Sequence, residues 1–358
     1  MSTPAWLVYG VGATGTLIVQ EAVRRGHTPL LAGRAAERLK PVAERFGLEW
    51  IVVDLLNTAA LARVVADVDL VVHTAGPFVA THDPMLRACL AHNTHYLDIS
   101  NEIPVFQSVR ARDRVARQQG IVLMPGIGFG VIATDGLAQH VAAALPDAKE
   151  LEIAISAYTQ GSSAGADKTR LDILARGGLV RRQGRLVKTA MGRGVKRLRF
   201  PHGEQTIVPI PSGDLEAAFY NTGIADITTY GVFPMPALVA RVALPVIEQA
   251  VAFPSVRRLL ERRVSATPRS DLPAATTALS TPPARSYVWA RADNRRGTVV
   301  EAWQEMGEGY AFTTAAAVRA VEAVLERRPT GALTPAQAFG ADFALGIDGL
   351  KRYHAAKG

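Results

Sequence analysis

A glycine-rich loop near the N-terminus has the residue types and spacing of a phosphate-binding turn. Gly10, Gly12 and Gly15 form the pattern G-x-G-x-x-G, with Ala13 and Thr14 between the last two glycines. The first glycine of such a loop allows a tight turn, the second lets the backbone approach a pyrophosphate, and the third lets a helix pack closely on a strand. The helix that follows offers free N–H groups and a positive dipole end to the phosphates. Because an apolar strand precedes the loop and a helical pattern follows it, we predict a dinucleotide site.

The end of the second strand indicates which dinucleotide binds. An NAD site usually has Asp or Glu there, which accepts a hydrogen bond from the ribose 2′-hydroxyl. Here Gly33 and Arg34 follow the strand, and a guanidinium can pair with a 2′-phosphate. Arg38, one helical turn further, could add a second positive charge. The alternative is that Arg34 only lies at the surface, but the missing acid favours NADP(H).

Further loops at strand ends are candidate cofactor contacts, because ligands of doubly wound sheets bind outside the carboxyl ends of the strands. Asp54 follows the third strand and could accept a hydrogen bond from the adenine amino group. Ala75, Gly76 and Pro77 follow the fourth strand, where their backbone would lie along the ribose and nicotinamide, unless they form only a turn. Asp98 ends the fifth strand and either orients the nicotinamide ribose or closes the turn.

Reduction of a C=C or C=N bond needs a proton in addition to a hydride. Tyr158 could donate it through its phenol, and Lys168 could anchor a carboxylate or lower the pKa of a neighbour. For both residues a structural role is an equal alternative. Asp135 and His73 are better explained as structural residues at an element end. The remaining histidines considered have no acid or cysteine at ligand spacing, so we expect no metal site: His82, His92 and His95.

The first 125 residues alternate short apolar runs with helical patterns, which is typical of a parallel sheet with crossover helices. We expect six strands, at residues 6–9, 30–32, 50–53, 70–73, 96–99 and 121–123. Helices should connect these strands. The first should begin near Thr14, three others should cover residues 35–46, 59–66 and 105–119, and one more should start at Pro84, with Asp83 as its N-cap. This order predicts an α/β protein with an N-terminal Rossmann domain, a doubly wound parallel sheet.

After Met124 the pattern changes to strands with longer loops. We expect a helix at 135–145 with Thr134 as N-cap, then strands, two helices, a Pro/Ser/Thr/Ala-rich loop and a hairpin. Their predicted ranges are, for the strands, 151–157, 206–210, 217–220 and 227–232, for the helices 237–252 and 256–263, for the loop 266–284, and for the hairpin 287–292 with 298–304. A last helix at 313–327 carries an apolar stripe that must be buried. We expect this helix and residues 336–345 to return to the first domain.

Composition bounds the protein class. A chain of 358 residues is long for one core, and 48% hydrophobic with 20% charged residues is typical of a packed globular protein. Cys89 is the only cysteine, and the N-terminus lacks the pattern of a signal peptide, so we expect a cytoplasmic protein without disulfides. Prolines and charges interrupt the longest apolar stretch, 232–253, which therefore predicts no transmembrane segment, although it could line a pocket for a lipid-like substrate.

The formal net charge of +8 raises the question of nucleic acid. Much of the basic excess lies in residues 181–199, without interleaved aromatic residues. A solvated basic face or a site for an anionic small molecule is the better interpretation, and we expect no nucleic-acid partner.

Several segments together resemble the saccharopine dehydrogenase-like oxidoreductases, in particular the bacterial trans-acting enoyl reductases. The N-terminal segments GVGATG, AGRAAERL, HTAGPF and YLDIS are shared with many Rossmann proteins. More discriminating are PSGDLEAAFYNTGIADITTYGVFP and TPAQAFGADF, and the resemblance extends over nearly the whole chain. Departures from the family pattern fall on loops expected to face the substrate, among them Asn101, Gly130 and the segment 166–169.

The resemblance implies an NADP-binding domain at residues 1–125, a second α/β domain with a mixed sheet at 126–305, and a C-terminal part, 306–358, that packs on the first domain. It also implies a substrate between the domains. We therefore predict an NADPH-dependent reductase that transfers hydride to a C=C or C=N bond of a small or medium-sized metabolite. A homodimer is compatible with this prediction. The alternative is a non-catalytic NADP(H)-binding sensor or scaffold protein.

Overall fold

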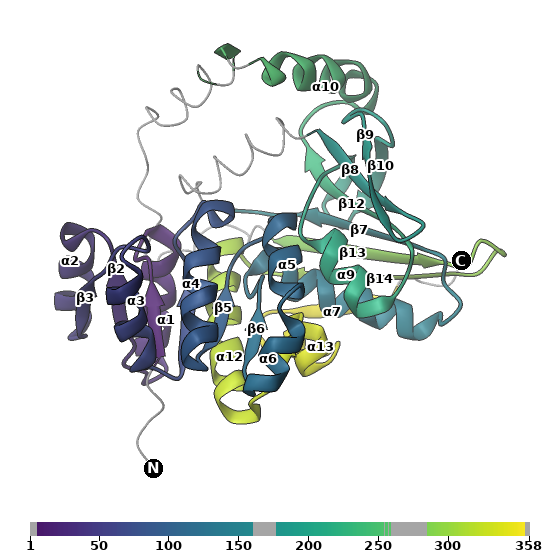
Figure 1. The fold of residues 1–358 in the computed structure, drawn as a ribbon. Helices are drawn as coiled ribbons and strands as arrows, with labels where there is room; N and C mark the ends of the chain where they lie inside the picture. Colours follow the sequence, from purple (N-terminus) through teal and green to yellow (C-terminus); the bar gives the residue numbers. More distant parts are fainter. Residues whose placement is uncertain (1–5, 160–176, 254, 257, 259–284, 355–358) are drawn as a thin grey trace. The chain divides into compact units, whose positions relative to one another are not determined.

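The computed structural model describes residues 6–159, 177–253, 255–256, 258 and 285–354 (Figure 1). The chain divides into two compact units. Of the described residues, the first unit contains 6–132 and 310–343, and the second contains the others. The domain limits predicted after residues 125 and 305 stay a prediction. The predicted helix at 256–263, the loop at 266–284 and Lys168 lie wholly or largely outside the described residues.

The first unit is built on a seven-stranded parallel sheet, sheet A (Figure 1). Starting from β1, the chain adds β2 and β3 on one side and then β4, β5 and β6 on the other, so the strand order reverses between β1 and β4. This confirms the predicted doubly wound Rossmann sheet. The strands, in spatial order, are β15 (Gly331–Ala332), β6 (Val122–Met124), β5 (His95–Asp98), β4 (Leu70–His73), β1 (Trp6–Tyr9), β2 (Leu30–Gly33) and β3 (Trp50–Val52). β15 comes from the C-terminal part, and its two residues pair with Val122 and Leu123.

Helices cover both faces of sheet A, and α4 and α12 lie on opposite faces (Figure 1). The bounds are α1 (Ala13–Arg24), α2 (Ala36–Phe46), α3 (Thr58–Ala66), α4 (Phe78–His92), α5 (Ile103–Arg110), α6 (Asp113–Gln119), α12 (Gly309–Arg327) and α13 (Pro335–Phe339), followed by the short η1 (Phe343–Gly346). The predicted apolar stripe of the last helix is buried, since Val318, Val321 and Val324 are fully inaccessible. Together with β15, this confirms the return of the C-terminal helix to the first unit. The predicted return of the whole segment 306–358 is wrong at its end, because residues 344–354 belong to the second unit, where Lys351–His354 pair with the strand Val299–Met306.

Two helix starts were predicted wrongly in the first 135 residues. α4 begins at Phe78, with Pro84 inside it, and Asp83 forms ion pairs of 2.7 Å with Arg87 and Arg112 instead of capping. α7 (Phe129–Ala144) begins six residues before the predicted 135. The reason is a distant cap, because the hydroxyl of Thr313 accepts a hydrogen bond of 3.2 Å from the Phe129 N–H. The predicted helix 105–119 is in fact two, α5 and α6.

The second unit is built on a mixed sheet, sheet B, as predicted. β7 and β12 pair in parallel, and the other pairs are antiparallel. The strands are β7 (Glu150–Ser156), β8 (Gly178–Arg182), β9 (Arg185–Thr189), β10 (Lys196–Phe200), β11 (Gly203–Pro209), β12 (Asp226–Phe233), β13 (Ser286–Asp293), β14 (Val299–Met306) and β16 (Lys351–His354). The hairpin prediction is confirmed, and α10 (Ala237–Ala252) has the predicted bounds.

The predicted strand at 217–220 is wrong, because these residues lie in α9 (Asp214–Thr222). A short apolar run has no periodicity that separates a strand from a helix. Here Asp214 and Glu216 occupy the first turn, where the helix dipole favours acids, and Gly223 ends the helix with a left-handed φ of 71°.

None of the helices in the described part of the chain combines the length and apolar character needed to cross a bilayer. Among the same residues, no group of three or more His, Cys, Asp or Glu is arranged to hold a metal ion.

Candidate functional site

The glycine loop lies at the carboxyl end of sheet A, where β1 and β4 are neighbours. Gly10 has a left-handed φ of 100°, and its N–H donates to the Ala32 carbonyl at 2.8 Å. A Cβ at this position would lie 2.7 Å from the Cβ of Ala75, in the loop that follows β4. Both the backbone conformation and the close approach of two loops therefore require glycine here.

Gly12 differs from Gly10, because it is not crowded by a neighbouring loop and the space beside it is open. It is the N-cap of α1, makes no side-chain capping bond, and is exposed together with Ala13. No atom lies within 4 Å of the position that its Cβ would take. The first-turn N–H groups of α1 thus face an open space, and no side chain at position 12 blocks the approach of a pyrophosphate. These residues fit a dinucleotide phosphate.

Gly15 brings α1 against the strand ends. A Cβ there would lie 2.7 Å from Oγ1 of Thr74 and closer still to the carbonyl of Gly10. The Thr74 hydroxyl donates to the Gly10 carbonyl, and the Thr74 backbone N–H donates to the Tyr9 carbonyl at 2.9 Å. Thr74 thereby fixes the turn at the start of the loop that was predicted to lie along the ribose and nicotinamide. What the sequence did not indicate is that its side chain binds the Gly10 carbonyl.

Arg34 and Asp54 lie at neighbouring strand ends and are both exposed. Between them lies the phenol of Tyr9, which donates to the Val53 carbonyl at 3.0 Å. Burial and the negative charge of Asp54 raise the pKa of Tyr9 to about 12, while the positive charge of Arg34 acts in the opposite direction. Asp54 Oδ1 accepts a hydrogen bond of 2.8 Å from the Leu56 N–H. Gly33 is buried beside this edge, and its carbonyl accepts from the Val53 N–H.

The loop after β4 is held by a side chain of α4. Gly76 and Pro77 are exposed, whereas the carbonyl of Ala75 accepts a hydrogen bond of 2.6 Å from the Thr81 hydroxyl. Thr81 Oγ1 also lies 3.0 Å from Nε2 of the inaccessible His73. Burial lowers the pKa of His73 to about 3, so the imidazole is neutral near pH 7. This agrees with the structural role expected for His73.

Asp98 is buried at the end of β5, and three protein groups donate hydrogen bonds to its carboxylate. It accepts hydrogen bonds from the Tyr96 hydroxyl at 2.7 Å, the Ser100 N–H at 2.8 Å and the Gly126 N–H at 3.1 Å. Burial raises the pKa of this carboxyl, and the hydrogen bonds from Ser100, Tyr96 and Gly126 act against it. In this arrangement Asp98 holds together the loops after β5 and β6.

Tyr158, one of the two predicted proton donors, belongs to the second unit. Tyr158 follows β7, its side chain is 38% exposed, and its N–H donates to Oγ of Ser286 at 3.0 Å. Lys168 lies outside the described residues. Asp135 is buried in α7, where Oδ1 accepts from the Asn221 amide at 2.8 Å, in agreement with the expected structural role. In the first unit, two departures from the family pattern meet, because a Cβ at Gly130 would lie 2.8 Å from Nδ2 of Asn101.

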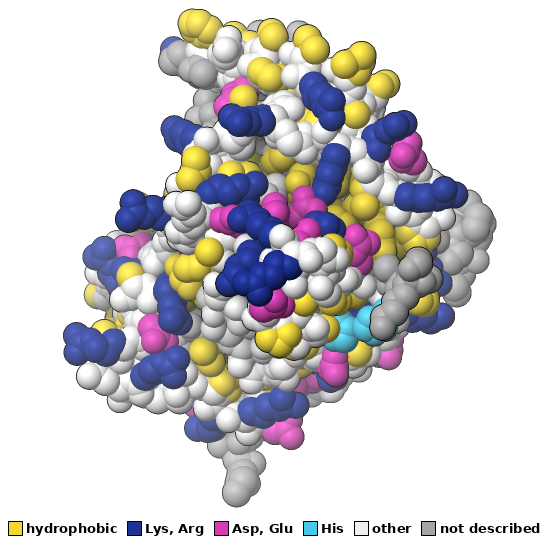
Figure 2. Space-filling model, turned by 90° about the vertical axis from the view of Figure 1, so that its right-hand side faces the viewer, with side chains coloured by type: hydrophobic (Ala, Val, Ile, Leu, Met, Phe, Trp, Pro, Cys, Tyr) yellow, Lys and Arg dark blue, Asp and Glu magenta, His cyan; other side chains and the backbone are white. Residues whose placement is uncertain are grey.

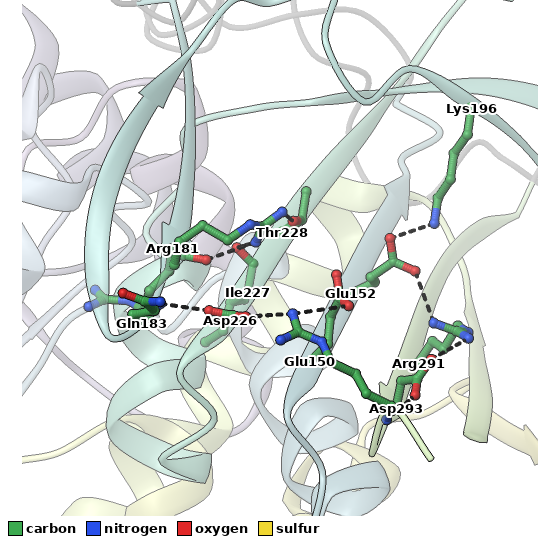
Figure 3. A network of polar contacts seen from close by, with 12 residues as sticks. Glu150, Glu152, Arg181, Gln183, Lys196, Asp226, Ile227, Thr228, Arg291 and Asp293 are labelled. Atoms are coloured by element: carbon green, nitrogen blue, oxygen red, sulfur yellow. Dashed lines mark hydrogen bonds and ion pairs between the residues drawn. The ribbon is translucent and has the colours of Figure 1, made fainter. Parts of the chain in front are cut away.

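Of the two interpretations of the basic segment, a solvated face or a site for an anionic small molecule, the first does not hold for Arg181 and Lys196, which are paired with acids. Arg181 is buried and forms an ion pair of 2.7 Å with the buried Glu216. Lys196 Nζ donates to Glu152 at 2.6 Å (Figure 3). The Tyr230 hydroxyl donates to the same carboxylate at 2.7 Å. Burial and the charge of Glu152 raise the pKa of Tyr230. An unpaired buried charge is costly, which explains why these cations are matched.

Most of the first unit matches a known family of cofactor-binding domains. Residues 6–124 match the family model described as the saccharopine dehydrogenase NADP binding domain. This part of the chain is therefore similar to the NADP-binding domain of saccharopine dehydrogenases. The matched range covers all six strands of the predicted Rossmann sheet and every candidate cofactor residue.

Curated relatives match a little more than a third of the chain. The saccharopine dehydrogenase-like oxidoreductase of Bos taurus is 26% identical over an alignment of 150 residues that covers 36% of this chain and 35% of that protein. The trans-acting enoyl reductase of Mycobacterium bovis (strain BCG / Pasteur 1173P2) is 28% identical over 138 residues, 36% of this chain and 33% of that protein. The match thus spans about a third of these relatives.

Two solved structures share the fold over nearly the whole chain. Apo saccharopine dehydrogenase (L-Glu forming) from Saccharomyces cerevisiae has a TM-score of 0.62 at 16% identity, covering 99% of this chain and 100% of that chain. Homospermidine synthase from Legionella pneumophila, in complex with NAD, has a TM-score of 0.65 at 10% identity, with 99% and 92% covered. At these identities the likeness concerns the fold, a Rossmann unit followed by a mixed sheet.

Proposed function

We propose that the protein is an NADPH-dependent reductase that transfers hydride to a C=C or C=N bond of a small or medium-sized metabolite. The single observation that carries this proposal is the open, glycine-bounded N-terminus of α1 beside Arg34, within a saccharopine dehydrogenase-type NADP-binding domain. Relatives named as oxidoreductases, one of them an enoyl reductase, support it.

In this proposal, the residues of the loop bind the cofactor through backbone and charge. The N–H groups of Ala13 and Thr14 bind the pyrophosphate at the start of α1. Arg34 pairs with the 2′-phosphate, while Asp54 accepts a hydrogen bond from adenine. The backbone of residues 75–77 orients the ribose and nicotinamide. When bound, NADPH supplies the hydride.

The proton that completes the reduction has two proposed donors in the second unit, Tyr158 and Lys168. Tyr158 is the one that the structure describes. Its backbone is fixed on both sides, because its carbonyl accepts from the Gly309 N–H at 2.9 Å and its N–H donates to Ser286. A fixed backbone and a half-exposed phenol suit a group that meets a substrate.

The second candidate function is a non-catalytic NADP(H) sensor or scaffold. It is favoured by Asp98 and His73, because both side chains are buried and form hydrogen bonds within the protein, Asp98 with Tyr96 and His73 through Nε2 with Thr81. A sensor would need the cofactor site and no proton donor.

The experiment is a turnover assay that follows NADPH absorbance in the presence of a panel of cyclic imines and enoyl thioesters. The proposal expects oxidation of NADPH with at least one of them, abolished in Gly12→Val and slowed in Tyr158→Phe. NADPH binding without oxidation by any compound would favour the sensor. A cytoplasmic location and a homodimer remain proposals, to be tested by cell fractionation and analytical ultracentrifugation.

A further inference from the structure

Helix α10 of the second unit is apolar on both its buried and its exposed side. Ala240 and Leu244 are buried against Met191, Val195 and Val208. The opposite side carries large apolar side chains with exposed fractions of 50–74%, namely Leu238, Val239, Val242 and Val246, and Phe253 follows the helix with 63%. A helix that is apolar all round is normally buried, so the exposed face of α10 is expected to lie against another apolar surface.

The exposed residues are spaced to form one continuous ridge. Leu238, Val242 and Val246 follow each other at intervals of four and therefore lie on one side of the helix. Of the polar residues in α10, Glu248 faces inward, where Oε2 accepts a hydrogen bond of 2.9 Å from the Met191 N–H. Arg241 donates to the Val195 carbonyl at 2.9 Å, which anchors α10 to the strand pair beside it.

That neighbouring segment is strongly cationic. Residues 178–200 contain eight Lys and Arg and no Asp or Glu. Four of these cations are exposed and form no ion pair within the described residues: Arg185, Lys188, Arg193 and Arg199. The loop 190–195 contacts α10, because a Cβ at Gly192 would lie 2.9 Å from Pro245. The upper part of Figure 2, where α10 lies, accordingly shows hydrophobic side chains above Lys and Arg.

We propose that α10 docks this protein on the surface of an anionic lipid bilayer. An apolar helix face that enters the interfacial region, with Lys and Arg beside it, is the arrangement by which peripheral proteins bind such membranes. A second copy of the chain would also cover the apolar ridge. However, a two-fold contact on this face would bring the two cationic segments together, and their repulsion opposes that dimer. The charge therefore favours an anionic surface.

The test is flotation of the full-length protein with vesicles of phosphatidylcholine, alone or mixed with phosphatidylglycerol. We expect binding to the anionic vesicles, weaker binding to the neutral ones, and release as salt is raised. Val242→Asp should weaken partitioning roughly tenfold or more, because a buried valine contributes that much. The matched control is Val115→Asp, an exposed valine of α6, which should float like the unmodified protein.

A second variant tests the cations separately, since Lys188→Glu combined with Arg193→Glu should abolish the preference for anionic vesicles. Unchanged melting temperatures and NADPH affinity establish that the variants are folded. The proposal is overturned if the unmodified protein floats with neither vesicle, if it binds both equally, or if Val242→Asp floats as before. It is equally overturned if ultracentrifugation shows a dimer that Val242→Asp dissociates while no vesicle is bound.

Discussion

The hydroxyl of Tyr9, at the end of β1, donates a hydrogen bond of 3.0 Å to the carbonyl of Val53, directly after β3. β2 lies between these two strands, so the bond passes over the strand end that carries Arg34. Because a pKa of about 12 keeps the phenol protonated, the bond persists at physiological pH. It joins the ends of β1 and β3 on either side of the strand end that carries Arg34, where the adenosine half of the cofactor is expected.

Arg34 should decide between the two dinucleotides. We expect NADPH to bind at least about tenfold more tightly than NADH, a difference of about 1.4 kcal/mol or more, because the guanidinium pairs with the 2′-phosphate. Arg34→Asp should reverse the preference. Titration calorimetry measures both affinities, and Arg63→Asp, an equally exposed arginine of α3, controls for the change in net charge. Equal affinity of the unmodified protein for both dinucleotides would contradict this assignment.

Gly12 and Gly15 should respond differently to substitution. Gly12→Val places a branched side chain in open space, so NADPH binding should collapse while the melting temperature stays the same. Gly15→Val would instead collide with Gly10 and Thr74 and should lower the melting temperature by several degrees. Calorimetry and thermal unfolding separate the two effects. Retained NADPH affinity in Gly12→Val would mean that the loop is only a turn.

His73 should make stability depend on pH. Its pKa is about 3 in the folded protein and about 6.5 in the unfolded chain, so only the unfolded chain gains the proton between these values. Stability is therefore complete above pH 6.5 and is lost as the pH falls toward 3, by up to about 1.4 kcal/mol per pH unit. Denaturant unfolding at several pH values should give a flatter profile for His73→Asn. The exposed His92→Asn is the control, and an unchanged slope in His73→Asn would refute the prediction.

The C-terminal return should stabilise the first unit. Truncation after Glu305 removes β15 and α12, although it leaves the six strands from β1 to β6 in place. It also leaves Asp113 without the Ala332 N–H, which donates to it at 2.8 Å. We expect a lower melting temperature and weaker NADPH binding. A truncated chain that melts and binds like the full chain would show that the return contributes nothing.

The basic segment 181–199 should not bind nucleic acid. Arg181 and Lys196 are matched by Glu216 and Glu152, which leaves fewer cations free for phosphates than the sequence suggests. Duplex DNA at physiological salt should therefore cause no saturable shift in a fluorescence-anisotropy titration. Micromolar affinity with a steep salt dependence would refute this.

The sequence by itself determined those features whose signals are local. The six strands β1 to β6 of sheet A were predicted within about one residue of their ends, because each apolar run is bounded by turn residues. The glycine loop and Arg34 were recognisable for the same reason, since their roles follow from backbone freedom and charge at a strand end. The bounds of α10 likewise follow from Pro236 and from a long apolar pattern.

Only the tertiary structure decided features that depend on distant partners. The start of α7 rests on the Thr313 hydroxyl, 184 residues away, which no local pattern reveals. β15 has two residues and exists as a strand only because β6 offers an unpaired edge. Asp98 ends a strand, as predicted, but its burial and its three donors come from the surrounding loops. Whether an apolar helix face such as that of α10 is covered is a matter of packing, because periodicity shows which side is apolar and not what lies against it.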